Sequence, residues 1–295
     1  MLPMPKATAK PQLNTELLRS RLKLKHLSSR STLLAHHPHV ANLLTSGALA
    51  ASLLMSSQSA LPALASLPPA SENRSVNLGP VDLQQRVAEA LASLLPPSVA
   101  PISATLEQQI STALHAIFGI HAVAELEGNR LNQSYGLIGA EQHLPRFPGD
   151  TVEQHDAIQK SGITPGRGAW GYFAYSKSDL TPDLIEKERY YVAVQTLYLP
   201  DWTTRLAYLR DWYKYRKVVV VNPANGKSVV AVVGDSGPAA FTGKHFGGSP
   251  EIMAYLNLNV GKQKGPVVLF FVDDPQDQIP LGPLEYNLEK PILPS

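Results

Sequence analysis

The sequence predicts a mainly β fold, in which one compact barrel follows a short helical segment. From about Val123 onward, short apolar runs alternate with Gly, Pro and Asn turns, a pattern typical of strands joined by tight connections. Two of these runs are almost pure valine and flank a turn-forming segment, and one short helical pattern precedes the last apolar run. This order of strand, hairpin, strand, helix and strand favours a barrel over a doubly wound sheet.

The valine-rich hairpin is the clearest element. Strands are expected over Val218–Asn222 and Ser228–Val233, joined by a turn over 223–226, because the Asn-Gly pair in it accepts the positive φ angles of a tight turn. Both strands are apolar at successive positions, so both of their faces should be buried. Further strands are expected over Tyr191–Gln195, Val267–Val272 and, early in the barrel, Trp170–Phe173.

Three helices are predicted from apolar spacing and end signals. The first follows Pro80 and ends before Pro96, and the second is capped by Ser103 or Thr105 and stopped by Gly119. Neither is apolar enough to form a core alone, so we expect them to pack on each other, on the barrel or on a partner. A third, near the carboxyl end, begins with Ser249-Pro250-Glu251 and is expected to close at Gly261.

The amino-terminal residues are typical of a secretory signal. A basic, acid-poor segment precedes an apolar run over Val40–Met55 and the sequence Ala63-Leu64-Ala65. We expect cleavage after Ala65, with retention as a membrane anchor through residues 40–55 as the alternative. An organelle transit peptide and an ordinary buried helix are the other interpretations. Export predicts an extracytoplasmic location, either secreted or at the periplasm or cell envelope.

These patterns divide the chain into five parts. They are a leader (1–65), a linker (66–80), a helical segment (81–122), a barrel domain (123–279) with an aromatic insertion at 197–215, and a tail (280–295).

Charge and cysteine content exclude several classes of function. The leader carries seven basic groups and one acidic group, which leaves 19 basic against 23 acidic groups in the remainder, a net charge of −4. A mildly acidic chain without a basic stripe argues against nucleic acid as a partner. With no cysteine, the chain has no disulfide, thiolate metal site or cysteine nucleophile.

The segment from Lys217 to Pro238 places a valine-rich strand, an Asn-Gly-Lys-Ser-Val hairpin and an Asp-Ser-Gly-Pro corner in succession. With the Ser-capped helix and last strand that follow, it resembles the rare lipoprotein A (RlpA-like) family, relatives of barwin and expansins. The resemblance covers residues 217–272. It implies a six-stranded double-psi β-barrel that acts on the cell wall, whose active members cleave peptidoglycan glycan strands as lytic transglycosylases.

Asp235 matches the essential acid of that family. Its position after a strand buried on both faces supports this assignment, because an apolar wall raises the pKa of a carboxyl towards that of a general acid. One such group is enough for a transglycosylase, in which the sugar's own hydroxyl replaces water, whereas a hydrolase needs two carboxylates. The alternative is that Asp235 only caps its turn.

Several positions depart from the family pattern. Ser236 stands where a basic residue is usual, Phe246-Gly247-Gly248-Ser249 lacks the second Asp, and neither the upstream His nor the lipid-attachment cysteine has a counterpart. A non-catalytic module that binds peptidoglycan or another envelope polysaccharide is therefore the alternative function. A serine hydrolase at Ser236 is a weaker one, because Gly234-Asp235-Ser236-Gly237-Pro238 is one glycine short of the chymotrypsin-like pattern.

Other residues are candidates for binding substrate or moving protons. The aromatic insertion offers rings that either stack on sugars or pack on the barrel. An acid/His-rich stretch from 141 to 156 could supply a second acid, a base or a metal site of oxygen and nitrogen ligands, or consist of polar loop residues that bond the backbone. Its spacing matches no metal motif, so no metal or cofactor is predicted. The candidate substrate-binding residues are His245, Ser236, Trp202, Trp212 and Tyr213, and the candidate second acids or bases are Glu141, His143 and Asp150.

Overall fold

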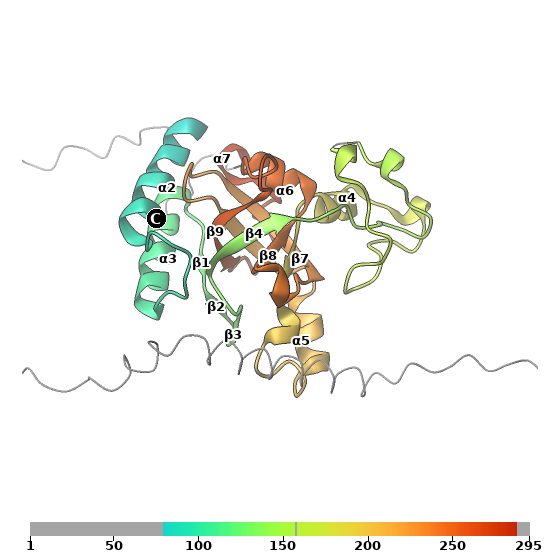
Figure 1. Cartoon of the computed structure of the whole chain (residues 1–295), viewed down its shortest axis with the longest axis horizontal. Helices are drawn as coiled ribbons and strands as arrows, with labels where there is room; N and C mark the ends of the chain where they lie inside the picture. The colour runs from blue at the N-terminus through green and yellow to red at the C-terminus, as the bar shows by residue number, and fades with distance from the viewer. Residues whose placement is uncertain (1–78, 157, 288–295) are drawn as a thin grey trace, which may run out of the picture. The chain divides into compact units, whose positions relative to one another are not determined.

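The computed structural model describes residues 79–156 and 158–287 (Figure 1). The predicted leader (1–65) and residues 66–78 of the predicted linker lie outside the described residues, so the signal and its cleavage site stay predictions. Within the described ranges, no helix combines the length and the apolar character needed to cross a bilayer.

Six strands close into a barrel, which confirms the mainly β prediction. β4 pairs antiparallel with β9 and parallel with β8, and β8 pairs antiparallel with β5. β5 pairs parallel with β7, and the antiparallel pairs β7–β6 and β6–β9 complete the ring. The barrel strands are β4 (Tyr135–Ala140), β5 (Tyr191–Val194), β6 (Lys217–Val221), β7 (Ser228–Ser236), β8 (Phe246–Gly248) and β9 (Lys264–Val272).

Short elements extend this barrel. β1 (Ala122–Val123) adds to β9, while β2 (Glu125–Leu126) and β3 (Asn129–Arg130) form a separate hairpin. β10 (Gly282–Pro283) adds to β7 and leads into α7 (Leu284–Asn287), so the predicted tail contains regular structure.

The hairpin between β6 and β7 confirms the prediction from Asn-Gly. Val221 pairs with Ser228, Gly226 has a φ of 71°, and its amide donates to the Asn222 carbonyl at 2.8 Å. Both strands are buried on both faces, as expected, because alternate valines contribute to two different clusters.

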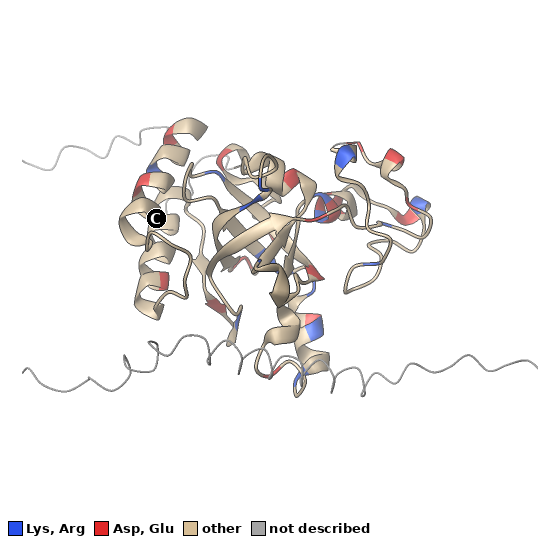
Figure 2. Ribbon diagram, viewed as in Figure 1, with Lys and Arg blue, Asp and Glu red and all other residues tan. Residues whose placement is uncertain are grey.

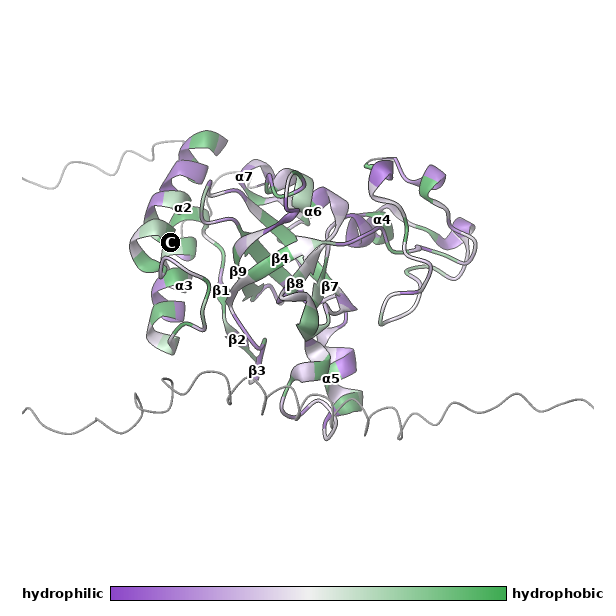
Figure 3. Cartoon of the chain, in the orientation of Figure 1, coloured by the Kyte–Doolittle hydropathy of each residue, from purple (hydrophilic) through white to green (hydrophobic). Residues whose placement is uncertain are grey.

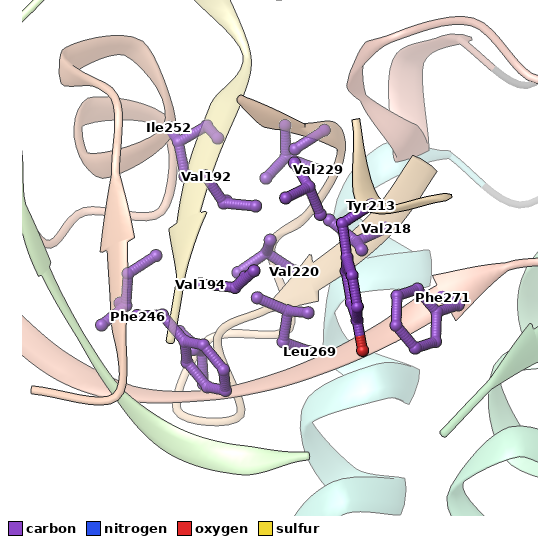
Figure 4. Packing of buried hydrophobic residues seen from close by; sticks show 14 of the residues in the cluster. Val192, Val194, Tyr213, Val218, Val220, Val229, Phe246, Ile252, Leu269 and Phe271 are labelled. Atoms are coloured by element: carbon purple, nitrogen blue, oxygen red, sulfur yellow. The ribbon is translucent and has the colours of Figure 1, made fainter. Parts of the chain in front are cut away.

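The inner cluster fills the barrel. Alternate side chains of the strands point to a common centre (Figure 4), which they share with two helices, α5 (Leu206–Tyr213) and α6 (Pro250–Tyr255). Tyr213 of α5 and Ile252 of α6 are both part of this cluster, so the two helices bury their apolar residues against the barrel's interior.

The outer cluster explains the two amino-terminal helices. α2 (Pro80–Leu94) and α3 (Ala104–Phe118) lie side by side (Figure 3), and their buried apolar residues form one cluster with residues of strands β6, β7 and β9. Ser103 caps α3 by accepting from the Leu106 amide at 3.2 Å, and Gly119 ends it with a φ of 71°. We expect each of these helices to pack on the other helix, on the barrel or on a partner. In the structure, each packs on the other helix and on the barrel.

Three sequence predictions need correction. α6 begins as predicted, with Ser249 accepting from the Ile252 amide, but it ends at Tyr255 because Asn257 adopts a left-handed φ of 60° before Gly261 is reached. Residues 170–173 form no strand, since the Gly171 amide turns back to the Gly168 carbonyl at 2.9 Å. α4 (Pro182–Arg189), capped by Thr181, was not expected.

Candidate functional site

Asp235 lies near the end of β7, where the strand emerges from the core. Its Oδ1 accepts from the amide of Ser236 at 2.8 Å and from the amide of Ala169, in a distant loop, at 2.7 Å. Burial raises the pKa of this carboxyl above its ordinary value, although the two amide bonds act in the opposite direction. The bond to Ser236 is the local turn contact that the alternative interpretation expects, and the bond to Ala169 fixes the carboxyl from a second side.

Glu141 follows β4 directly and shares this electrostatic environment. Burial raises its pKa, Lys244 lowers it, and the charge of Asp235 raises it further. The Lys244 Nζ lies 3.9 Å from Glu141 Oε1 and donates to the Ala140 carbonyl at 3.1 Å. The charge of the predicted acid thus acts on the pKa of one of the three candidate second acids or bases, without a direct contact between the two side chains.

Two glycines make room for these side chains. A Cβ added at Gly247 would lie 2.5 Å from Glu141 Oε1, and one added at Gly139 would collide with the Lys244 side chain. Gly247 belongs to the Phe-Gly-Gly-Ser segment at 246–249, and its lack of a side chain gives Glu141 space over β8.

His143 and Asp150 belong to a different, fully buried cluster. His143 Nδ1 lies 3.1 Å from Glu188 Oε1, and His155 lies between Glu188 and Asp150. Burial opposes protonation of His143, but its hydrogen bond to Glu188 holds its pKa above the ordinary value. The pKa of Asp150 is lowered despite burial, because Arg146 donates to it. The sequence candidates thus separate into two places.

Ser236 and His245 are held by neighbouring groups. The Ser236 hydroxyl bonds to that of Thr196, and within 79–156 and 158–287 no histidine bonds to it, which leaves a serine nucleophile without a base. His245 Nδ1 accepts from the Leu137 amide at 2.9 Å, so the proton of the neutral ring is on Nε2. Burial lowers the pKa of His245, which favours this neutral form.

The aromatic insertion packs on the barrel. Trp202, Trp212 and Tyr213 are 9%, 7% and 1% exposed, and the indole of Trp212 donates to Glu127 Oε2 at 2.7 Å. Of the two interpretations, burial favours packing, and these three rings do not offer a face to a sugar. Other rings are exposed: Tyr198 (50%) and Tyr208 (47%) within the insertion and Phe241 (92%) outside it, and the Tyr198 hydroxyl accepts from the Ala240 amide.

A cleft beside Ala169 was not predicted from the sequence. It is lined by Arg167, Trp170 and Arg210 together with the glycines of the same loop, and the Trp170 indole donates to the Arg210 carbonyl at 2.7 Å. Outside this cleft, charged residues are concentrated on the helices and on the loops around α4 (Figure 2). The sequence indicated only that residues 162–170 form a loop. It did not reveal the contact of this loop with Asp235, because that contact arises from the folding of distant segments onto each other.

Comparison with known proteins adds no relative to this description. No family model matches the chain, and no curated protein matches it. The site is therefore defined by its own features: the half-buried carboxyl of Asp235 held by two amides, Glu141, whose pKa responds to the charge of Asp235, and Lys244 beside Glu141.

Proposed function

We propose that this chain is an exported cell-envelope protein that acts on peptidoglycan glycan strands, with Asp235 as the general acid of a lytic-transglycosylase-like cleavage. The observation that carries the proposal is the environment of Asp235, a carboxyl held by two backbone amides with a pKa raised by burial. Such a group keeps its proton at a higher pH than an ordinary aspartic acid and can give it to a leaving oxygen.

In this mechanism protonated Asp235 donates to the glycosidic oxygen as the bond from that oxygen to the anomeric carbon breaks. A hydroxyl of the same sugar forms the new bond to the anomeric carbon, and its proton returns to Asp235. No water is consumed, and the product is an anhydro sugar. Ionised Glu141 would stabilise the positive charge that develops on the sugar ring.

The pairing of Asp235 with Glu141 favours hydrolysis as a second candidate reaction. Hydrolases use two carboxyl groups, one as acid and one as base or nucleophile. The charge of Asp235 raises the pKa of Glu141, so Glu141 is the candidate for the second carboxyl. The two reactions differ in product, because hydrolysis leaves a reducing end.

A non-catalytic glycan-binding module of the same fold is the alternative. The exposed rings of Phe241 and Tyr198 favour it, since flat exposed rings stack on sugars without chemistry. The double-psi topology is part of both proposals, and the parallel pairs β4–β8 and β5–β7 inside an otherwise antiparallel barrel support it. Neither function requires nucleic acid, and membrane contact would come only through an uncleaved amino terminus.

The test is digestion of purified peptidoglycan by the wild type, by Asp235→Asn and by Asp211→Asn, with products identified by mass spectrometry. Asp211 is an exposed aspartate of α5 and serves as the matched control. We expect anhydro-sugar fragments from the wild type and the control and none from Asp235→Asn. Reducing-end fragments would identify a hydrolase. No fragments from any folded variant, with retention on insoluble sacculi, would identify the binding module.

A further inference from the structure

A second site lies within the loops between β4 and β5, apart from the proposed function. Three side chains from separate segments converge there: His143, His155 and Glu188, the last from α4. One ligand atom from each lies within 4.8 Å of the others, and all three residues are buried. The carboxylate of Glu188 faces Nδ1 of His143 at 3.1 Å and Nδ1 of His155 at 3.4 Å.

These spacings suit a metal ion. Ligands about 2 Å from a tetrahedral zinc ion are about 3.3 Å from one another. Two imidazoles and a carboxylate form a ligand set that zinc accepts, and a chain without cysteine can offer only nitrogen and oxygen ligands. The fourth tetrahedral position would be left to water or to Glu251.

An outer layer of contacts orients one of the imidazoles. Nε2 of His155 lies 3.2 Å from Asp150 Oδ2, which leaves Nδ1 directed at Glu188. Asp150 is itself held by the Arg146 guanidinium at 2.9 Å and 3.1 Å. A carboxylate on the far nitrogen of a histidine is the usual support of a metal-bound imidazole, because it fixes the tautomer and the ring orientation.

The nitrogen and oxygen atoms that face one another in this cluster are in contact, but two further buried polar atoms of the region lack partners. The Nε2 of His143, a fully buried residue, has no hydrogen-bond partner among the described residues, and neither has the buried Oε2 of Glu251. Buried polar atoms without partners are rare and call for an explanation. Glu188 and Asp150 are two carboxylates of the cluster, and the Arg146 guanidinium contacts Asp150 directly.

The site would also stabilise a segment with little apolar core. The loops from 141 to 176, drawn in green to yellow beside the barrel in Figure 1, contain short 3₁₀ turns and no longer helix or strand among their described residues. Of their few buried apolar residues, Leu144 and Phe173 form a small cluster with Tyr191. Segments with so small a core commonly depend on a metal or a disulfide, and this chain has no cysteine.

We propose that His143, His155 and Glu188 bind one divalent transition-metal ion, with zinc the best chemical fit, and that Asp150 positions His155 for it. The ion's role is structural, since its ligands are buried and it joins α4 to the loops that carry the two histidines.

The experiment uses the purified chain, stripped of metal by a chelator and titrated with Zn²⁺ against a chromophoric competitor. We expect one tightly bound zinc per chain and a rise in melting temperature when it binds. Glu188→Gln should abolish tight binding, and Asp150→Asn should weaken it about 10- to 100-fold, as the loss of such an outer carboxylate does elsewhere. His121→Gln is the control, because His121 and His115 form another close pair, with ring centroids 4.5 Å apart, outside this site.

A cobalt spectrum of the wild type tests the proposal even if a variant does not fold. Cobalt at this site should show the intense visible absorption of a four-coordinate ion, and X-ray absorption should show two imidazoles and oxygen. Zinc lost in His121→Gln but kept in Glu188→Gln would identify adventitious surface binding and overturn the proposal. A six-coordinate, fully hydrated cobalt spectrum would overturn it as well.

Discussion

Asp235 and Glu141 are far apart in the sequence, yet the charge of one acts on the proton affinity of the other. Each follows or ends a barrel strand, and glycines on neighbouring strands leave the space that Glu141 and Lys244 fill. When Asp235 is ionised, its charge makes Glu141 hold its proton to a higher pH, because a negative charge nearby opposes the formation of a second one.

The pH dependence of glycan cleavage follows from the raised pKa of Asp235. A general acid must be protonated, so the rate should be highest below this pKa and should fall as the pH rises through it. Because burial raises the pKa, the fall should come above the ordinary aspartate value of about 3.9. Initial rates measured across the acidic and neutral range check this. A rate that increases with pH through the same window would contradict the role of Asp235 as acid.

Some site residues could be predicted from the sequence and others could not. Asp235 stands at the end of a strand that reads as buried, so its desolvation could be inferred from local pattern alone. Trp212 and Tyr213 could not be placed, because an aromatic ring with a polar tip suits both a core and a surface. Ala169 contributes only its amide, and a backbone donor has no signature in the sequence.

At the scale of elements, the hairpin turn and α2 fit each other closely. Gly226 has a φ of 71°, and a Cβ added there would collide with the Gln84 carbonyl of α2. The turn therefore needs glycine for two reasons, its backbone angle and its contact with the helix.

Replacing Gly226 by alanine distinguishes the cost of the left-handed backbone from the cost of the collision with α2. Gly226→Ala should destabilise the fold by clearly more than Gly261→Ala, for which the left-handed backbone alone costs about 1–2 kcal/mol. Gly261 is the matched control, because its φ is 68° and no atom lies within 4 Å of its added Cβ. Urea unfolding of the two variants makes the comparison. Equal losses would mean that α2 does not pack against the turn.

The central strands should tolerate no charge. Val230 is fully buried on the outer face of β7, beneath the amino-terminal helices, so Val230→Asp should lower the free energy of unfolding by about 3–5 kcal/mol or prevent folding. Val260→Asp is the control, since Val260 is 79% exposed. Thermal unfolding followed by circular dichroism distinguishes them, and an unchanged melting temperature for Val230→Asp would show that this strand is not core.

Element boundaries were predictable where a strong end signal is present. Ser103, Gly119 and Ser249 act as the caps that their residue types suggest. The end of α6 was missed because asparagine at 257 takes the left-handed conformation that glycine at 261 was expected to supply. The polar helix α4, which carries Glu188, lacks an apolar stripe that could have revealed it.

At the scale of the whole molecule, the barrel is covered on one side by α2 and α3 and joined to α5 and α6 through its inner core. This arrangement explains why strands β6 and β7 are apolar on both faces. The existence of these strands and their pairing as a hairpin could be read from the sequence, but their other partners, β5 for β7 and β9 for β6, could not. The parallel pairs β4–β8 and β5–β7 join segments separated by long loops, and no local pattern encodes such pairing.

Titration of the side-chain carboxyls by carbon NMR, in the wild type and in Asp235→Asn, tests the central claim most directly, because it needs no substrate. In the wild type both Asp235 and Glu141 should titrate above their ordinary values. In Asp235→Asn the pKa of Glu141 should fall, since the charge that raises it has gone, whereas Asp211→Asn should leave it unchanged. An ordinary pKa for Asp235, with no response at Glu141 to its replacement, would contradict the account.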